Sequence, residues 1–264
     1  MARTERVERP MYQLIDTHAH LEEIENLEPS ITDARDSGLV AIITVGSDDK
    51  SNREALQIAN SHPGLVYPAL GLHPSRINLA EIEHTLEFIE ANIADAIAIG
   101  EIGLDYHKRV RAQADKELQQ TVLRQLLHIA SRHDKPVSLH SRYAWHDALK
   151  LTNEVPLEKV VFHWYTGTSS VLREIISRGY FLSVTPAVTY HEEHRRTVKE
   201  TPLEQLLLET DSPVVYGRGR EFEFEARPAD VLVSLKGIAG IKGLDEAEAA
   251  RVTSANARRL FRLK

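Results

Sequence analysis

The feature that most constrains the fold is an alternation of short, apolar, β-rich runs with longer segments of helical period. The alternation occurs about eight times along the chain, and it is the pattern of repeated strand–helix units that form a parallel sheet. The expected strands are Tyr12–Asp16, Val40–Val45, Val66–Leu70, Ala96–Ile99, Pro136–His140, Val160–His163, Tyr180–Val184 and Leu206–Thr210. The sequence therefore predicts an α/β fold.

The segments between these runs carry apolar residues at steps of three and four, which predicts helices with one buried face. Ser30 is a candidate N-cap of the first helix, and Gly38 is its candidate end. The other expected helices are Lys50–Asn60, Leu79–Asn92, Ala114–His133, Ser169–Arg178, His191–Glu200, Asp230–Lys236, Asp245–Val252 and Ala255–Leu260. Because the last three follow the final strand, they are expected to close the fold.

Eight parallel strands with crossover helices close most simply into a (β/α)8 TIM-type barrel. The alternative is an open, doubly wound sheet, which would place a glycine-rich phosphate loop after the first strand. Here the first strand runs into Asp-Thr-His-Ala-His, residues 16–20, which contains no glycine. We therefore expect one barrel domain over residues 11–264, preceded by a flexible tail at residues 1–10.

Composition limits the classes of function. The 264 residues include no cysteine, which excludes disulfides, thiolate nucleophiles and thiolate zinc sites. The first ten residues lack an apolar core, and no apolar run approaches the roughly 18 residues of a membrane span, so a cytoplasmic protein without a membrane partner is expected. A net charge of −7 argues against a protein that covers nucleic acid through its overall charge. It allows an enzyme that binds a few phosphates locally. A monomer and a weak homo-oligomer both stay open.

Imidazoles and carboxylates recur where the expected strands end, which is the face on which a barrel builds its active site. Each one alone has an ordinary structural explanation: a lone histidine is often a hydrogen-bonded structural residue, Glu101 could cap a helix, and Asp211 could form a turn. Together they form the pattern of a nitrogen- and oxygen-ligated divalent metal site. The candidate ligands are His18, His20, Glu101, His140, His163 and Asp211.

Six ligands exceed what one tetrahedral ion needs, whereas a two-metal site with a bridging carboxylate uses them all. Such ions sit about 3.5–4 Å apart and clamp both oxygens of a displacement at phosphorus. Glu101 is the candidate bridge, because flanking glycines allow close approach. Asp211 is a candidate ligand and general base. Zinc, magnesium and manganese all remain possible occupants.

In chain order, seven short motifs resemble the TatD-related deoxyribonucleases, which are metal-dependent hydrolases with an amidohydrolase-like barrel. The matching segments are 15–20, 71–74, 99–106, 139–142, 162–167, 208–213 and 256–261. The resemblance implies an exonuclease that removes nucleotides from DNA ends with magnesium, manganese or zinc. It also implies one ion on His18, His20 and Asp211, a second on His140 and His163, Glu101 between them, and His73 near the scissile phosphate.

Two departures from the family pattern bear on the substrate. After the last strand the chain reads Ala226-Arg227-Pro228, which keeps the family's arginine but not its asparagine, and the loop before it is acidic. Trp164 stands where the family commonly has a smaller residue, and we expect it to narrow the pocket. Candidate substrate contacts are therefore His73, Arg142, Trp164 and Arg227, with Tyr106, Trp145, Trp164 and Tyr165 as candidate partners for stacking on a base.

Two other classes of function stay open. The same barrel chemistry can hydrolyse an ester, lactone or amide, including an aminoacyl ester on transfer RNA, and the acidic loop suits such a substrate. A metal-binding scaffold without catalysis is the third class. It would be expected to lack Glu101 or Asp211, and both are present.

Overall fold

The computed structural model describes residues 12–264, and its centre is an eight-stranded parallel sheet in which each strand pairs with the next one in sequence. The segment that follows β8 meets β1 through a parallel bridge between Ala19 and Ser212, so the sheet closes on itself. The predicted TIM-type barrel is thereby confirmed. The strands are β1 Leu14–Ala19, β2 Leu39–Val45, β3 Val66–Leu70, β4 Ala98–Asp105, β5 Val137–Arg142, β6 Val160–Phe162, β7 Phe181–Val184 and β8 Leu206–Leu208. The tail predicted for residues 1–10 lies outside the described residues.

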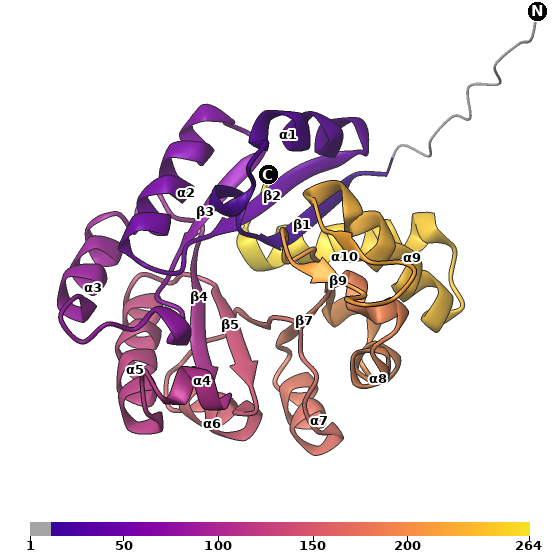
Figure 1. Cartoon of the computed structure of the whole chain (residues 1–264). Coiled ribbons are helices and arrows are strands. Elements are labelled where there is room, and N and C mark those ends of the chain that lie inside the picture. The colour runs from indigo at the N-terminus through magenta and orange to yellow at the C-terminus, as the bar shows by residue number, and fades with distance from the viewer. Residues whose placement is uncertain (1–11) are drawn as a thin grey trace, which may run out of the picture.

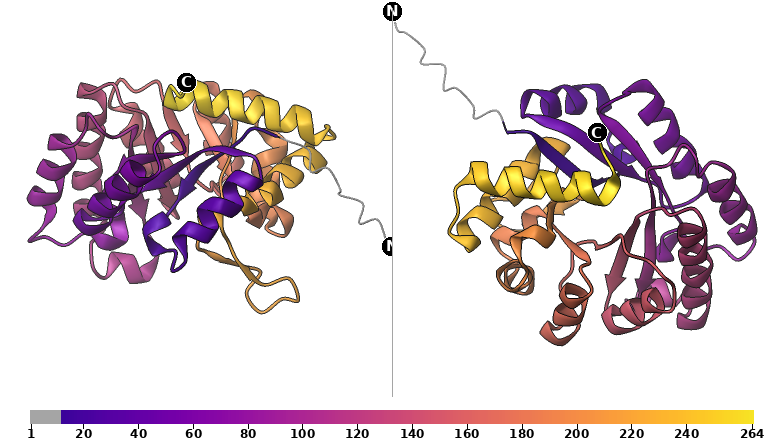
Figure 2. Two further views of the ribbon diagram at one scale, coloured as in Figure 1. Left: turned by 90° about the horizontal axis from the view of Figure 1, so that it is seen from above. Right: turned by 180° about the vertical axis from the view of Figure 1, so that it is seen from behind.

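Helices surround the strands in chain order, as the colour sequence in Figure 1 shows. They are α1 Leu27–Asp36, α2 Asp49–Ser61, α3 Ile82–Ala91, α4 Lys108–Arg111, α5 Lys116–Arg132, α6 Trp145–Asn153, α7 Ser169–Ser177, α8 Glu192–Glu200, α9 Val231–Lys242 and α10 Glu246–Phe261. A short hairpin of β9 Val215–Tyr216 and β10 Phe224–Glu225 projects from the barrel (Figure 2). Within residues 12–264, no helix combines the length and apolar character needed to cross a bilayer.

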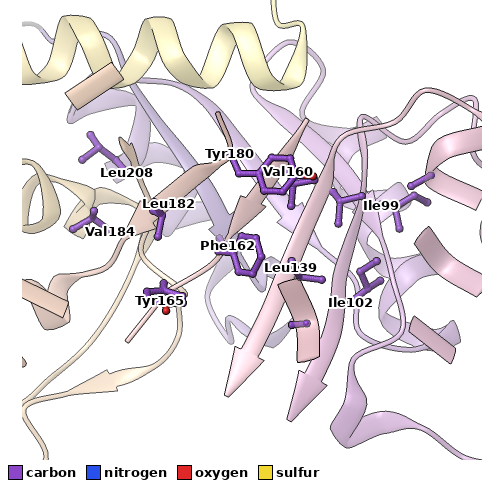
Figure 3. Close-up of a cluster of buried hydrophobic side chains, with 14 of the residues drawn as sticks. Ile99, Ile102, Leu139, Val160, Phe162, Tyr165, Tyr180, Leu182, Val184 and Leu208 are labelled. Carbon is purple, nitrogen blue, oxygen red and sulfur yellow. The ribbon is translucent and has the colours of Figure 1, made fainter. Parts of the chain in front are cut away.

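Two large groups of apolar side chains build most of the core. One lies between the strands and the surrounding helices and includes Leu139, Phe162 and Leu182 (Figure 3). The other joins residues from most of the strands to Leu260 and Phe261 of α10. Helix α10 therefore covers the end of the barrel at which the strands begin, which confirms the expected closing role and leaves the opposite end for the functional site.

Strand β4 is longer than predicted, and the difference falls at Glu101, the candidate bridging ligand. We expected the strand to end at Ile99 and Glu101 to lie in a turn, but the strand continues to Asp105. Gly100 and Gly103 are weak strand formers, which is why the sequence indicated a turn. In the structure Gly103 lies so close to β5 that a Cβ there would be 2.0 Å from the carbonyl oxygen of His140. The pairing with β5 shifts register between Ile99 and Ile102, and this irregular stretch holds Glu101.

Other boundaries also differ from expectation. Strand β1 extends to Ala19, so it contains His18. Helix α1 begins at Leu27 instead of near Ser30, because Pro29 sits in the first helical turn, where no backbone donor is needed. Two predicted C-terminal helices form the single helix α10. Its Thr253 hydroxyl bonds back to the carbonyl of Ala249, so this polar stretch does not break the helix.

Gly71, just after β3, offers a direct test of how tightly β4 is held. A Cβ at Gly71 would lie 2.4 Å from the backbone oxygen and 2.6 Å from the backbone nitrogen of Glu101, neither of which can move independently of the strand. Gly71→Ala should therefore lower the free energy of unfolding by about 1–3 kcal/mol. Gly240→Ala, at an open position in α9, should instead raise it by about 0.5–1 kcal/mol. Denaturant titration of both variants measures this, and equal effects would contradict the close approach.

Candidate metal centre

Five histidines and two carboxylates gather at the end of the barrel where the strands finish. Closure of the barrel brings the two most distant segments together: the backbone N–H of Asp211 donates to the carbonyl of His18 at 2.9 Å, and that of His20 donates to Ser212 at 2.8 Å. The first-strand histidines thus face the aspartate that follows the last strand. All six predicted metal ligands meet in this one place, together with His73.

Glu101 lies at the middle of the cluster with its two carboxylate oxygens directed to different sets of imidazoles. Its Oε2 is 3.6 Å from Nε2 of both His18 and His20. Its Oε1 is 2.9 Å from Nδ1 of His140 and 3.7 Å from Nε2 of His163. One carboxylate therefore stands between two groups of nitrogen atoms, as a bridging ligand would.

Asp211 completes the first group. Its Oδ1 lies 3.6 Å from Nε2 of His18 and 3.5 Å from Nε2 of His20, while its Oδ2 lies 3.8 Å from Nε2 of His163. Asp211 has a φ of 51°, a backbone region that aspartate tolerates better than most residues. Single ligand atoms from His18, His20 and Asp211 thus lie within 4.8 Å of one another, close enough to share one ion.

His73 approaches the second group. Its Nε2 is 3.7 Å from Oε1 of Glu101, close enough for an ion between them. Its Nδ1 lies 2.7 Å from the hydroxyl oxygen of Ser75 and 3.1 Å from the backbone nitrogen of the same residue, and these contacts orient the ring. Burial lowers the pKa of His73 to about 3. His73 therefore presents its Nε2 to the centre.

The electrostatics favour ionised carboxylates and bound positive charge. Burial would raise the pKa of Glu101, but the imidazoles of His73 and His18 hold it well below its usual range. The pKa of Asp211 is likewise lowered, because His163 and a hydrogen bond with His20 outweigh burial. Burial would lower the pKa of His163, but Glu209 and Asp211 raise it to about 10. The centre is thus a place of negative potential in which a cation is stabilised.

These residues fit a divalent ion. Nε2 of His18 is buried and has no hydrogen-bond partner among residues 12–264, although two carboxylate oxygens lie 3.6 Å away. Two ligand atoms that are each about 2.1 Å from a shared ion lie about 3.0–3.5 Å apart, which is close to these separations and too long for strong hydrogen bonds. The mixed imidazole and carboxylate donors suit zinc, manganese and related ions.

Polar residues behind the ligands orient them, and these residues were not among the predicted site residues. Oε1 of Glu209 lies 3.0 Å from Nδ1 of His163 and accepts the backbone N–H of Trp164 at 3.0 Å. Asp16 accepts the hydroxyl of Thr210 at 2.6 Å, so it ties the first strand to the last. Such partners fix the ring orientation of a metal-binding histidine. The spacing of Glu209, two residues before Asp211, is the signal that could have found it.

A cavity of about 920 Å³ opens over the centre. His73, Arg142 and Trp164, three of the four predicted substrate contacts, line it. Arg142 is held by Asp105, which accepts from Nη2 at 2.7 Å and from Nε at 3.1 Å. Arg227 is not brought to this cavity. It precedes the short helix η5 Pro228–Asp230, and its side chain turns toward Asp33 of α1 at 3.7 Å.

The predicted stacking residues are only partly available. Tyr165 is fully buried, and its hydroxyl donates to the carbonyl of Thr168, so the prediction that it meets a base was wrong. The hydroxyl of Tyr106 bonds to Asp147, and Lys116 covers its ring. Trp145 and Trp164 both line the cavity. Trp164 packs on Tyr216 with ring centroids 5.5 Å apart.

The family model described as TatD related DNase matches residues 15–262. The chain belongs to this family. The predicted resemblance is confirmed, and with it the prediction of a hydrolase of the TatD type.

Two similar sequences and one solved structure illustrate the family relationship. The human protein named deoxyribonuclease TATDN3 is 32% identical, over 94% of this chain and 94% of its own length. The Bacillus subtilis protein YabD, named as an uncharacterized metal-dependent hydrolase, is also 32% identical, over 95% of this chain and 99% of its own. The structure of the Escherichia coli TatD homologue YJJV superimposes with a TM-score of 0.85 and 27% identity, covering 96% of this chain and all of that one. The TatD family match thus extends over nearly the full barrel.

His194 holds helix α8, which forms part of the cavity wall. Because this histidine is buried, the stability of the protein should depend on pH. Nε2 of His194 accepts the backbone N–H of Thr185 at 3.1 Å, its Nδ1 lies 3.2 Å from the carbonyl oxygen of Tyr165, and burial lowers its pKa from 6.5 to about 4. Between these values the unfolded chain binds a proton that the folded chain does not, so stability falls with falling pH. The loss should reach about 3 kcal/mol between pH 6.5 and 4.

Denaturant titrations over this pH range, run on wild type and His194→Gln, measure the contribution. Glutamine keeps a donor and an acceptor but does not titrate, so the stability difference between the two proteins should shrink as the pH falls. A difference that does not change with pH would contradict a neutral, buried His194.

Proposed function

We propose that the protein hydrolyses phosphodiester bonds of DNA with two divalent ions, and that it works as an exonuclease. The observation that carries this proposal is the placement of Glu101. Its Oε2 faces His18 and His20 and its Oε1 faces His140 and His163, at distances of 2.9–3.7 Å. We further propose that residues 11–264 act as one metallohydrolase domain. The names of the human and bacterial relatives support DNA and a metal as substrate and cofactor. A cytoplasmic location stays a prediction.

The residues divide between two ion positions. His18, His20 and Asp211 would hold one ion and His140 and His163 the other, with Glu101 shared. When bound, divalent ions polarise the phosphoryl oxygens and lower the pKa of water toward neutrality. Zinc, manganese and magnesium all suit this role, and the mixed nitrogen and oxygen donors favour the first two.

The chain's own groups account for proton transfer and for holding the phosphate. Asp211 is ionised and lies at the floor of the cavity, so it can accept the proton of the attacking water. Arg142 uses Nε and Nη2 to bind Asp105, which leaves Nη1 for a phosphate oxygen. His73 presents its Nε2 to the same centre, where it can contact a second oxygen. Arg76, Arg196 and Arg218 also line the cavity and add positive charge around the acidic centre.

A substrate panel tests the class of bond. Purified protein loaded with zinc, manganese or magnesium is given single-stranded DNA, a lactone and an aminoacyl ester of transfer RNA. We expect release of nucleotides from the DNA, and loss of this activity after chelation that returns when metal is added. Hydrolysis of only the lactone or the aminoacyl ester would contradict the proposal. DNA cleavage that is unaffected by a chelator would contradict the role of the metals.

Asp211→Asn tests the proton acceptor. Removing a general base costs about 100- to 10,000-fold in rate, so turnover of DNA should fall by at least about 100-fold. Asp95→Asn, at an exposed position in the loop before β4, is the matched control and should keep wild-type turnover. Initial rates and metal content are measured on the same samples. Unchanged turnover in Asp211→Asn would rule out the assigned role.

A further inference from the structure

Tyr143 stands out among the residues around the cavity because its large aromatic side chain is exposed. It lies between β5 and α6, just after Arg142, and it lines the cavity. Its side chain is 61% exposed, and of the four large hydrophobic residues exposed among residues 12–264 it is the one that lines the cavity. A single exposed aromatic side chain is ordinary by itself, so it is the position of Tyr143 at the cavity that calls for an explanation.

The backbone at Tyr143 is held in an unusual conformation. Its φ is 56°, which is a true outlier for a bulky residue and indicates strain that the surrounding structure must maintain. The flanking segments are fixed, since the carbonyl of Arg142 accepts the N–H of Tyr106 at 2.8 Å and α6 begins at Trp145. The strained backbone thus belongs to a residue that lines the cavity.

Neighbouring side chains orient the ring without covering it. Its centroid is 5.9 Å from that of Trp145 at an interplanar angle of 64°, and 6.3 Å from that of His107 at 26°. Among residues 12–264 its hydroxyl makes no hydrogen bond, so no polar contact accounts for its position. An accessible aromatic ring in a fixed orientation is what a planar ligand requires for stacking.

The position of the ring relative to the metal centre indicates which ligand it meets. Tyr143 is three residues beyond His140, so their Cα atoms are at most about 11 Å apart. Arg142, with a free guanidinium nitrogen, lies between them in sequence. A phosphate at the centre would therefore bring an attached nucleobase close to the ring, and stacking on aromatic side chains is the usual way to hold an unpaired base.

We propose that Tyr143 is a stacking platform for an unpaired nucleobase beside the scissile phosphate. This inference rests on the proposed function and deepens it, because a base within a duplex is already stacked and paired. The substrate is accordingly a single strand or a frayed end. The platform is a specificity residue: it positions the nucleotide, while the metal ligands and Asp211 carry the reaction.

Binding of a phosphorothioate-linked thymidine oligonucleotide to the metal-loaded protein tests the platform, with fluorescence anisotropy as the readout. Tyr143→Asn keeps a residue that tolerates positive φ but removes the ring, and it should weaken binding by at least about fivefold. Tyr143→Phe, the matched control, keeps the ring and should bind as wild type. An oligonucleotide with abasic residues should bind to all three proteins equally. Thermal melting verifies that each variant is folded.

Wild-type affinity in Tyr143→Asn would overturn the platform, as would an equal loss of affinity for the normal and abasic oligonucleotides. Hydrolysis of unmodified DNA by the wild type is measured separately. If the wild type hydrolyses DNA and Tyr143→Asn binds the oligonucleotide with wild-type affinity, only the platform is overturned. Suppose instead that Tyr143→Asn loses affinity only for the oligonucleotide that carries bases, and that the wild type does not hydrolyse DNA. This result would support the platform and overturn the proposed function.

Discussion

The buried charge of Glu101 is the constraint on which the rest of the site depends. A carboxylate that is 4% exposed cannot stay ionised without compensation, because taking an isolated charge out of water is very costly. Here imidazoles face both of its oxygens and lower its pKa. An arrangement with two nitrogen-lined positions on either side of one carboxylate is suited to a pair of cations.

The barrel makes this arrangement possible by joining distant parts of the chain. Glu101 comes from an irregular stretch of β4, where Gly71 and Gly103 allow the neighbouring backbones to approach. Asp211 reaches His18 and His20 only because β1 and β8 close the sheet. Asp16 strengthens the same junction through Thr210, so the bond that closes the barrel also aligns one half of the centre.

Much of this could be predicted because the signals are local. The six ligands lie at, or soon after, the ends of five of the eight predicted strands. The parallel barrel places those strand ends on one face, so the six ligands follow from the strand pattern. The extent of β4 could not be read in the same way, since Gly100 and Gly103 disfavour a strand unless neighbouring chains use the space. Nor could the sequence distinguish Tyr165, which is buried, from Tyr143, which is exposed. Arg227 fits the family motif, yet its side chain turns to Asp33, a contact set by the packing of η5 beside α1.

The most direct test of the account is anomalous X-ray diffraction from crystals loaded with manganese or zinc. Two bridged ions should give two peaks about 3.5–4 Å apart, one among His18, His20 and Asp211 and the other beside His140 and His163, with Glu101 in contact with both. A single fully occupied ion, or a second ion that does not touch Glu101, would contradict the bridging role from which the proposed function is derived.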